Sequence, residues 1–194
     1  PVGRRHYSFG GHSLTDVFDR ITLASTRLLP LLARLTFAAV LLRYFWGSAL
    51  TKLDGLFTPS LGAYAQIFPR QMEAAGYDVS QFGAFHWLAV MGGTYAEFLL
   101  PALIVVGLFT RLAALGMIGF TVVQSLTDIG GHKADAVTVG AWFDRASDAL
   151  IMDQRTFWVF VFVTLVGMGG GMFSLDSALK SRLTRKGYAP ESAA

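Results

Sequence analysis

Four long apolar runs dominate the sequence, and each is close to the length that a helix needs to cross a lipid bilayer. A crossing takes about 20 mostly apolar residues, because the hydrocarbon core is about 30 Å thick and a helix rises about 1.5 Å per residue. The four runs cover approximately residues 28–53, 84–109, 112–129 and 156–173. The sequence therefore predicts an all-α membrane protein built as a bundle of four transmembrane helices.

The overall composition agrees with a membrane protein and excludes several kinds of chemistry. Of the 194 residues, 53% are hydrophobic and 15% are charged, and the mean hydropathy is +0.48, which is too apolar for a typical soluble domain of this length. The sequence has no cysteine, which excludes disulfides, thiolate metal sites and dithiol redox chemistry within it. The formal charge of +3 fits contact with anionic lipid better than nucleic-acid binding, because no basic patch is interleaved with aromatic residues.

Basic residues cluster in three segments that fall on the same side of a four-span arrangement. Lys and Arg are held on the cytoplasmic side of a membrane, so we expect both termini there, in the cytoplasmic (inner) membrane of a bacterium. We divide the chain into an N-terminal arm (1–27), a transmembrane domain (28–173) and a basic C-terminal tail (174–194), and we expect no cleavable signal peptide because the first apolar run starts late. The basic residues are Arg4, Arg5, Arg20 and Arg27 in the arm, Arg111 between the second and third spans, and Lys180, Arg182, Arg185 and Lys186 in the tail.

Two segments outside the spans have the pattern of short surface helices. In the first long loop, Ser60 is a suitable helix cap, apolar residues follow at helical spacing, and Pro69 bends or ends the helix. In the tail, Ser174 is a suitable cap, Asp176 suits the positive end of the helix dipole, and Gly187 ends the helix. We therefore expect an interfacial helix in the loop and a basic amphipathic helix lying on anionic lipid in the tail.

The stretch "LLRYFWGSALTKL" places Arg43 inside the first apolar run, and "YAEFLLP" places Glu97 inside the second. A charge inside a bilayer costs about 2.5 to 3.5 kcal/mol, so it usually faces the bundle interior beside a partner. Counted from the cytoplasmic ends of their helices, the two residues lie at similar depth. We therefore predict an ion pair between Arg43 and Glu97.

This pair has two interpretations. One is a structural cross-link, since loss of either member would leave an uncompensated buried charge costing about 3 to 5 kcal/mol. The other is a polar pocket with aromatic walls that takes a quinone or another small ligand, including a lipid. The residues predicted around that pocket are Tyr44, Trp46, Lys52, Tyr95, Gln124 and Asp128.

Other motifs give little support for catalysis. His86 and His132 fall near the outer ends of the second and third spans, but no paired-histidine spacing supports haem or metal ligation, and a histidine at a membrane interface is usually solvated. The run "GMGGGMF" lacks the strand, Lys and Ser or Thr of a phosphate-binding loop, so it indicates close helix packing or a helix break. No catalytic constellation is present in the sequence.

Three segments resemble the DoxX family of small four-helix membrane proteins: "RYFWGSALTKL", "AEFLLPALIVVGLFTRLAAL" and "GGGMFSLD". The resemblance extends from Leu28 to Asp176. Many relatives have a proline where this chain has Gly170, a departure that we expect to loosen the turn. The matching positions are Arg43, Gly47, Lys52, Glu97, Gly107, Arg111, Gly169, Gly171 and Asp176.

The resemblance implies a role beside an oxidoreductase. Namesakes of the family are membrane subunits associated with thiosulfate:quinone oxidoreductase. A related quinone-linked family uses dithiol chemistry, which a chain without cysteine cannot perform alone. We expect a membrane subunit that docks an oxidoreductase partner and contributes to a quinone pocket, with no covalently bound cofactor. The alternative is a purely structural accessory subunit of a larger respiratory or photosynthetic complex. A transporter ranks last, since the sequence shows no inverted repeat.

Overall fold

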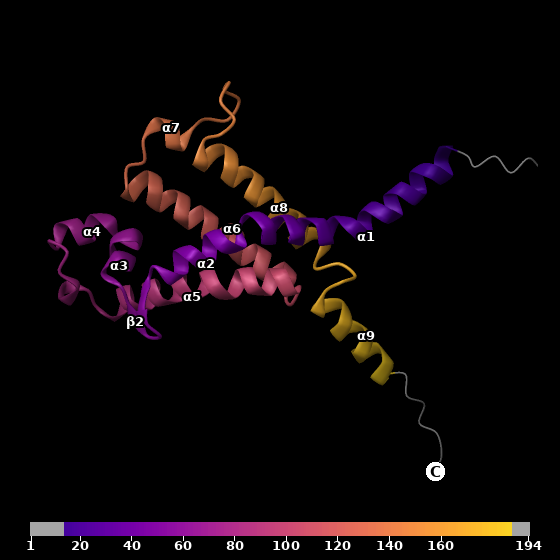
Figure 1. Ribbon diagram of the computed structural model, residues 1–194, viewed down its shortest axis with the longest axis horizontal. Coiled ribbons are helices and arrows are strands. Elements are labelled where there is room, and N and C mark those ends of the chain that lie inside the picture. The colour runs from indigo at the N-terminus through magenta and orange to yellow at the C-terminus, as the bar shows by residue number, and fades with distance from the viewer. Residues whose placement is uncertain (1–13, 188–194) are drawn as a thin grey trace, which may run out of the picture.

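The computed structural model describes residues 14–187, with side chains as far as residue 184. Four helical segments of the described chain are long and apolar enough to cross a membrane: Leu14–Val40, Ala84–Val106, Thr110–Gly131 and Leu150–Met168. They correspond to the helices α1 (Leu14–Val40), α5 (Ala84–Val106), α6 (Thr110–Leu126) and α8 (Arg155–Met168), the last two extended by π-helical segments (Figure 1). The prediction of an all-α, four-span membrane protein is confirmed.

The first crossing differs from its predicted bounds. α1 begins at Leu14, so residues 14–27, predicted as part of an arm, continue the first helix. A short helix, α2 (Leu42–Leu50), follows after Leu41, and hydrogen bonds from Leu41 N to Phe37 O and from Phe45 N to Leu41 O continue across the bend. α1 and α2 therefore form one bent rod, of which α2 packs against α5. Residues 1–13 of the predicted arm and 188–194 of the predicted tail lie outside the described residues.

Glycines in left-handed conformation end two of the spans. Gly107 has a φ of 71° and closes α5 at Val106, three residues before α6 begins at Thr110. Gly169 has a φ of 75° and closes α8 at Met168, five residues before the predicted end of the fourth span. L-residues with a side chain rarely adopt this conformation, so glycine stops the helix where it stands.

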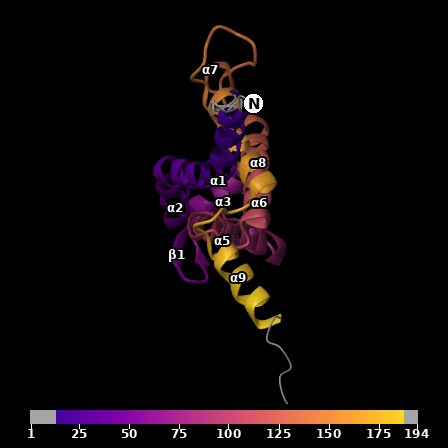
Figure 2. The same cartoon turned by 90° about the vertical axis from the view of Figure 1, so that its right-hand side faces the viewer.

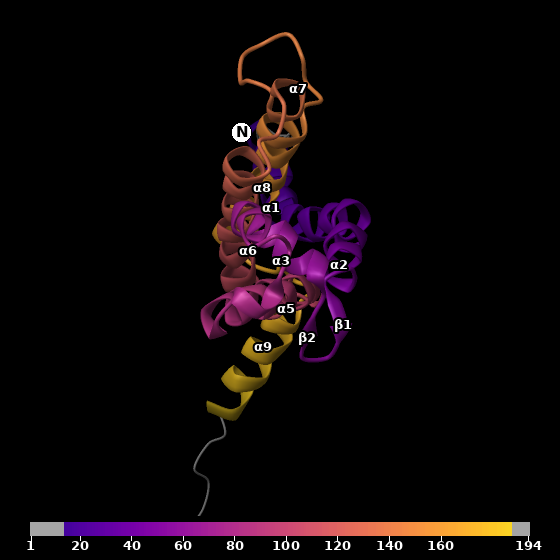
Figure 3. The same cartoon turned by 90° about the vertical axis from the view of Figure 1, so that its left-hand side faces the viewer.

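The two ends of the bundle differ in structure. We call the end that carries the Gly107–Phe109 turn the turn end; α9 (Leu175–Gly187) starts there and projects away from the bundle (Figure 2). The opposite end, which we call the loop end, carries the remaining elements and the loop of α7 (Figure 3). These elements are the two-stranded hairpin β1 (Leu53–Gly55) and β2 (Thr58–Pro59), α3 (Leu61–Ile67), α4 (Pro69–Ala74), the 3₁₀ turn Val79–Gln81, and α7 (Ala136–Val139).

The predicted surface helices are present in modified form. Ser60 caps α3 by accepting a hydrogen bond from Ala63 N at 3.1 Å, and Pro69 starts α4 rather than ending the helical region. Ala63, Tyr64, Met72 and Val90 form a small buried cluster, which fixes α3 and α4 onto the start of α5. Burial raises the pKa of the Tyr64 hydroxyl above its ordinary value.

The main core lies between α1, α2, α5, α6 and α8. It is rich in aromatic residues: the rings of Phe37 and Phe162 meet edge to face with centroids 5.7 Å apart. In a membrane, such contacts stabilise a bundle by close packing rather than by exclusion of water. Fully buried side chains at the centre are Phe37, Phe45, Ile104, Met117, Phe162 and Leu165.

Candidate functional site

A cavity of about 570 Å³ lies between α5 and α6, and we call it the α5–α6 cavity. Its volume lies within the ~300 to 1,000 Å³ of typical small-ligand pockets. Part of its lining, contributed by both helices, consists of residues with no side chain or only a methyl group. These residues are Ala89, Gly93, Ala96, Gly116 and Gly119.

A buried ion pair lies in the wall of this cavity. Lys52 Nζ contacts Glu97 Oε2 at 2.8 Å and Oε1 at 3.0 Å, and the two side chains are only 7% and 4% exposed. Ser48 completes the group, since its hydroxyl contacts Lys52 Nζ at 2.5 Å and Glu97 Oε1 at 3.3 Å. Each charge therefore has its opposite charge and a further hydrogen-bond partner, which is the condition for keeping charges inside an apolar bundle.

Polar groups from the loop-end part of α6 line the same cavity. Gln124 donates from Nε2 to Tyr44 Oη at 2.7 Å, while its Oε1 is buried and has no partner in the described structure. The helix then widens into a π-helical segment, Thr127–Gly131, which is a frequent feature of functional sites. Asp128 lines the cavity from this segment, but its carboxylate already accepts from Arg155 Nη2 at 2.5 Å.

The predicted Arg43–Glu97 pair is wrong. The partner of Glu97 is Lys52, and Arg43 is exposed on α2 with no ion pair to any described residue. Its position on α2 explains the difference: Arg43 is two residues, about 200°, from the buried Phe45 and lies on the exposed face, whereas Lys52 follows the end of α2 at Leu50 and is buried. Similar depth was therefore not enough to make Arg43 the partner.

The structure brings together only part of the predicted pocket. Lys52, Gln124 and Asp128 line the α5–α6 cavity with Glu97. The three predicted aromatic residues do not line it and hydrogen-bond elsewhere: Tyr44 to Gln124, Trp46 to the carbonyl of Phe98 at 3.1 Å, and Tyr95 to the carbonyl of Leu56.

The two histidines have separate hydrogen-bond partners. His86 Nε2 contacts Gln71 Oε1 at 2.7 Å, with phenylalanine rings around the imidazole. His132 lines the α5–α6 cavity and donates to the carbonyl of Gln66 at 3.0 Å. Across residues 14–187, no group of three or more His, Cys, Asp or Glu side chains is arranged to hold a metal ion.

At the turn end, the buried Arg34 is a residue that the sequence analysis did not single out. Its guanidinium donates to four backbone carbonyls, those of Ile104 (3.0 Å), Val105 (2.6 Å), Gly170 (2.9 Å) and Phe173 (2.6 Å). The first two belong to the last turn of α5, where carbonyls have no helical donor and the helix dipole is negative. Arg34 therefore joins α1 to the ends of α5 and α8.

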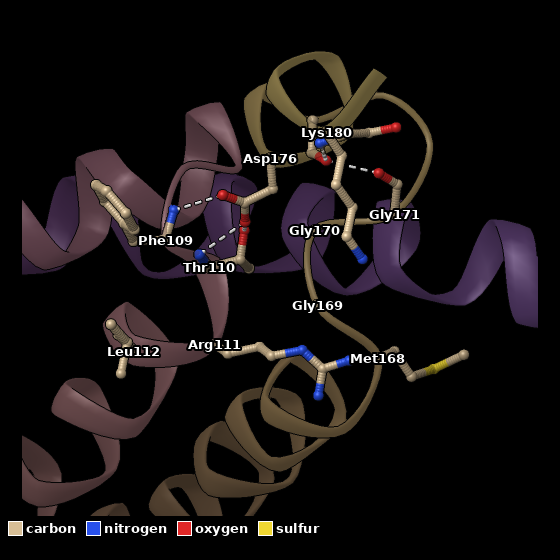
Figure 4. Close-up of a pocket in the computed structure, with 12 residues that line it drawn as sticks. Phe109, Thr110, Arg111, Leu112, Met168, Gly169, Gly170, Gly171, Asp176 and Lys180 are labelled. Carbon is tan, nitrogen blue, oxygen red and sulfur yellow. Dashed lines mark hydrogen bonds between the residues drawn. The ribbon is translucent and has the colours of Figure 1, made fainter. Parts of the chain in front are cut away.

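Asp176 joins α9 to the start of α6 (Figure 4). Its Oδ1 accepts from Phe109 N at 2.8 Å, and its Oδ2 accepts from the amide (3.0 Å) and hydroxyl (2.8 Å) of Thr110. Partial burial acts to raise the pKa of Asp176, but these hydrogen bonds and the charge of Arg34 outweigh it, so the pKa lies below its ordinary value. Asp176 thus caps a neighbouring helix in addition to lying in the first turn of its own.

Most of the positions that carried the family resemblance gather at this turn end. Arg111 Nη1 donates to the carbonyl of Val166 at 2.8 Å, and its guanidinium packs over Gly169. A Cβ on Gly107 would lie 2.5 Å from the Cβ of Ser174, so only glycine fits there. Gly171, with a φ of 74°, approaches Pro30 in the same way. The other four positions, Arg43, Gly47, Lys52 and Glu97, lie elsewhere; Gly47 is exposed on α2 with open space around it.

Gly170 does not loosen the turn as expected. It is buried, its carbonyl accepts from Arg34, and a Cβ at this position would lie 2.7 Å from both Ser174 Cβ and Thr110 Oγ1. A proline here would need the surrounding side chains to shift. Glycine therefore lets the turn pack closely against Ser174 and Thr110.

Comparison with known proteins supports the family resemblance. A family model described as DoxX matches residues 29–127, or 99 of the 194 residues. Comparisons with curated proteins and with solved structures gave no match. The matched part contains Arg34, the Lys52–Glu97 pair, the Gly107 turn and all of α5 and α6. With four membrane-spanning helices and a family match over half of its length, the chain belongs to the DoxX family.

Proposed function

We propose that this protein is a subunit of a bacterial inner-membrane oxidoreductase assembly and that its α5–α6 cavity binds a quinone. The observation that carries the proposal is the combination of small apolar residues with the buried Lys52–Glu97 pair in the lining of one cavity. A quinone ring is planar and apolar on its faces, and its carbonyl oxygens need hydrogen-bond donors. The glycine and alanine residues of the lining leave space for the ring face. The Lys52 ammonium would donate to a quinone carbonyl in exchange for one of its present contacts with Glu97 and Ser48.

The polar groups of the cavity also suit the proton chemistry of a quinone. Reduction to a quinol takes up two protons together with two electrons, so a site that exchanges them needs groups that can hold protons. Glu97 and His132 both line the cavity and are of this kind. The electrons have to come from the cofactor of a partner, because this chain offers no cysteine of its own.

The start of α1 offers a surface for such a partner. Figure 1 shows the first turns of α1 extending beyond the other spans. Between residues 14 and 29 no described side chain is buried, and apolar side chains on this part of the helix are exposed. Leu14, Phe18 and Ile21 are 76%, 64% and 57% exposed. A second subunit packed along this segment would cover them.

Binding of a short-chain benzoquinone analogue to the purified protein in detergent tests the quinone site. At about 100 times its dissociation constant, a ligand stabilises the folded state by about 2.7 kcal/mol, which for a chain of this size raises the melting temperature by about 5 to 10 °C. Gly119→Leu should abolish this shift, because Gly119 lines the cavity and a Cβ there would have no atom within 4 Å, so the added side chain would take up space that the ligand needs.

Gly92→Leu is the matched control, because Gly92 also has open space around it but lies outside the cavity lining. This variant should keep the full quinone-dependent shift. Equal shifts in both leucine variants would remove the α5–α6 cavity from the proposal.

Native mass spectrometry of the protein released gently from its own membranes tests the docking role. A particle that contains redox-cofactor subunits supports the proposal. A particle with partner subunits but without redox cofactors or quinone favours the alternative, a structural accessory subunit. A monomer without ligand contradicts both.

A further inference from the structure

A second cavity, of about 520 Å³, lies at the turn end of the bundle, and we call it the turn-end cavity. Its lining comes from the start of α6, the glycine segment Gly169–Gly171 after α8, and the first turns of α9 (Figure 4). The cavity lies where the apolar spans end and the chain passes into the basic helix α9. This is the level at which lipid headgroups meet a membrane protein.

Two cationic side chains face this cavity from different elements. Figure 4 shows the guanidinium of Arg111, on α6, and the ammonium of Lys180, on α9, both extending toward the Gly169–Gly171 segment. Arg111 uses Nη1 for the carbonyl of Val166, and its other nitrogens make no hydrogen bond to the described chain. Lys180 is exposed and has no ion pair or hydrogen bond from its ammonium to a described residue. Both therefore have donors available for a ligand.

The one acidic side chain in the lining does not neutralise these cations. Asp176 directs both carboxylate oxygens at Phe109 and Thr110, and the buried Arg34 lies close enough to lower its pKa. The described charges around the cavity are thus Arg34, Arg111 and Lys180 against Asp176, which leaves an excess of positive charge. An anionic ligand is the complement of such a cavity.

We propose that the turn-end cavity binds the phosphate of an anionic membrane phospholipid, held by Arg111 and Lys180. Exposed apolar side chains surround the cations and give the acyl chains a surface on which to lie: Phe109 is 60% exposed and Leu112 is 68% exposed. A basic cavity between spans, at headgroup level and bordered by apolar surface, is the arrangement that recognises such lipids. The bound lipid would join α6 to α9 through its phosphate.

The test measures lipid binding to the delipidated full chain by native mass spectrometry, with phosphatidylglycerol and phosphatidylcholine of identical acyl chains. We expect phosphatidylglycerol to bind more tightly than phosphatidylcholine. Lys180→Gln should weaken phosphatidylglycerol binding about fivefold, since a basic residue near an anionic lipid contributes about that factor. Arg111→Gln should weaken it at least as much, and Lys180→Gln remains informative if loss of the Val166 contact prevents folding.

Arg182→Gln is the matched control, because Arg182 is exposed on the same helix but does not line the cavity. It should keep the affinity of the unaltered chain. Equal losses for Lys180→Gln and Arg182→Gln would overturn the proposal, because they would indicate general attraction to the basic helix. Inorganic phosphate is the second probe: protection against heat by phosphate at millimolar concentration, without preference between the two lipids, would overturn the lipid assignment.

Discussion

Replacing Lys52 by methionine removes the ammonium that pairs with Glu97 and keeps a side chain of similar length. Glu97 is then left as a buried carboxylate whose remaining donor is the hydroxyl of Ser48, at 3.3 Å. Loss of one member of a buried pair costs about 3 to 5 kcal/mol. The retained Ser48 hydrogen bond offsets about 1 kcal/mol of this. We therefore expect Lys52→Met to lower the free energy of unfolding by about 2 to 4 kcal/mol.

The double variant distinguishes the interaction energy between Lys52 and Glu97 from the separate effect of each substitution. Glu97→Gln alone should cost a similar amount, because it leaves the Lys52 ammonium without a counter-charge. The double variant, Lys52→Met with Glu97→Gln, should cost about 2 kcal/mol less than the sum of the two single costs. It leaves no unpaired charge, whereas each single variant leaves one. Equilibrium unfolding in mixed micelles with increasing SDS, followed by tryptophan fluorescence, gives these free energies.

Arg43→Met is the control for the pairing itself. Arg43 is exposed, so its replacement should change the free energy of unfolding by no more than about 0.5 kcal/mol. If the cost of the double variant lies within about 0.5 kcal/mol of the sum of the two single costs, the coupling between Lys52 and Glu97 is refuted. A loss for Arg43→Met as large as that for Lys52→Met would refute the assignment of the partner.

Three further predictions concern the turn end. Arg34→Gln should lower the free energy of unfolding by about 3 kcal/mol in the same assay, because glutamine cannot reach all four carbonyls that the guanidinium satisfies; a change below about 1 kcal/mol would contradict this role. Gly107→Ala should cost at least about 2 kcal/mol, since it combines a positive φ with a Cβ 2.5 Å from Ser174, whereas Gly92→Ala should be neutral or stabilising. Asp176→Asn should cost about 1 kcal/mol at pH 7. Because the folded pKa of Asp176 is depressed, its ionised form stabilises the fold above the unfolded pKa of about 4, and this contribution is lost as the pH falls through the folded value. The difference between the unaltered chain and Asp176→Asn should therefore shrink below about pH 4, and a difference that grows there would contradict the hydrogen-bonding role.

The number and nature of the spans could be predicted from the sequence, because length and apolarity are local properties of the chain. To predict which basic residue pairs with Glu97, a second local property is needed, the side of the helix on which the residue lies. Arg34 and Lys52 are eighteen residues apart, five turns of a helix with 3.6 residues per turn, so they share a face with the buried Phe37 and Phe45. Arg43 lies midway and falls on the opposite face. Face and depth together would have selected Lys52.

The α5–α6 cavity could be predicted only in part. Glu97 lies on the buried stripe of α5, with Val90, Thr94 and Ile104, so the sequence pattern places it inside the bundle. The small residues of the lining come from two helices, Gly93 from α5 and Gly116 and Gly119 from α6, and periodicity within one helix carries no information on how two helices are aligned. The aromatic residues predicted as walls illustrate the same limit: Trp46 and Tyr95 hydrogen-bond to backbone carbonyls outside the lining, and Tyr44 lies behind Gln124, to which it is hydrogen-bonded.

At the turn end, residues that hold the helices together also carry the positive charge from which the membrane orientation is predicted. Arg34 is satisfied by carbonyl groups, which carry partial charges and cannot cancel a full positive charge. The binding of this guanidinium to the end of α5 and to the segment after α8 therefore adds net positive charge to the same end that carries Arg111 and Lys180. A positively charged end is held on the cytoplasmic side during insertion and attracts anionic lipid afterwards. If a carboxylate of α5 or α8 had bound Arg34 instead, the helices would be joined equally well, but this contribution to the charge would be lost. Pairing with carbonyls therefore gives the turn end the charge on which both the predicted orientation and the proposed lipid site depend.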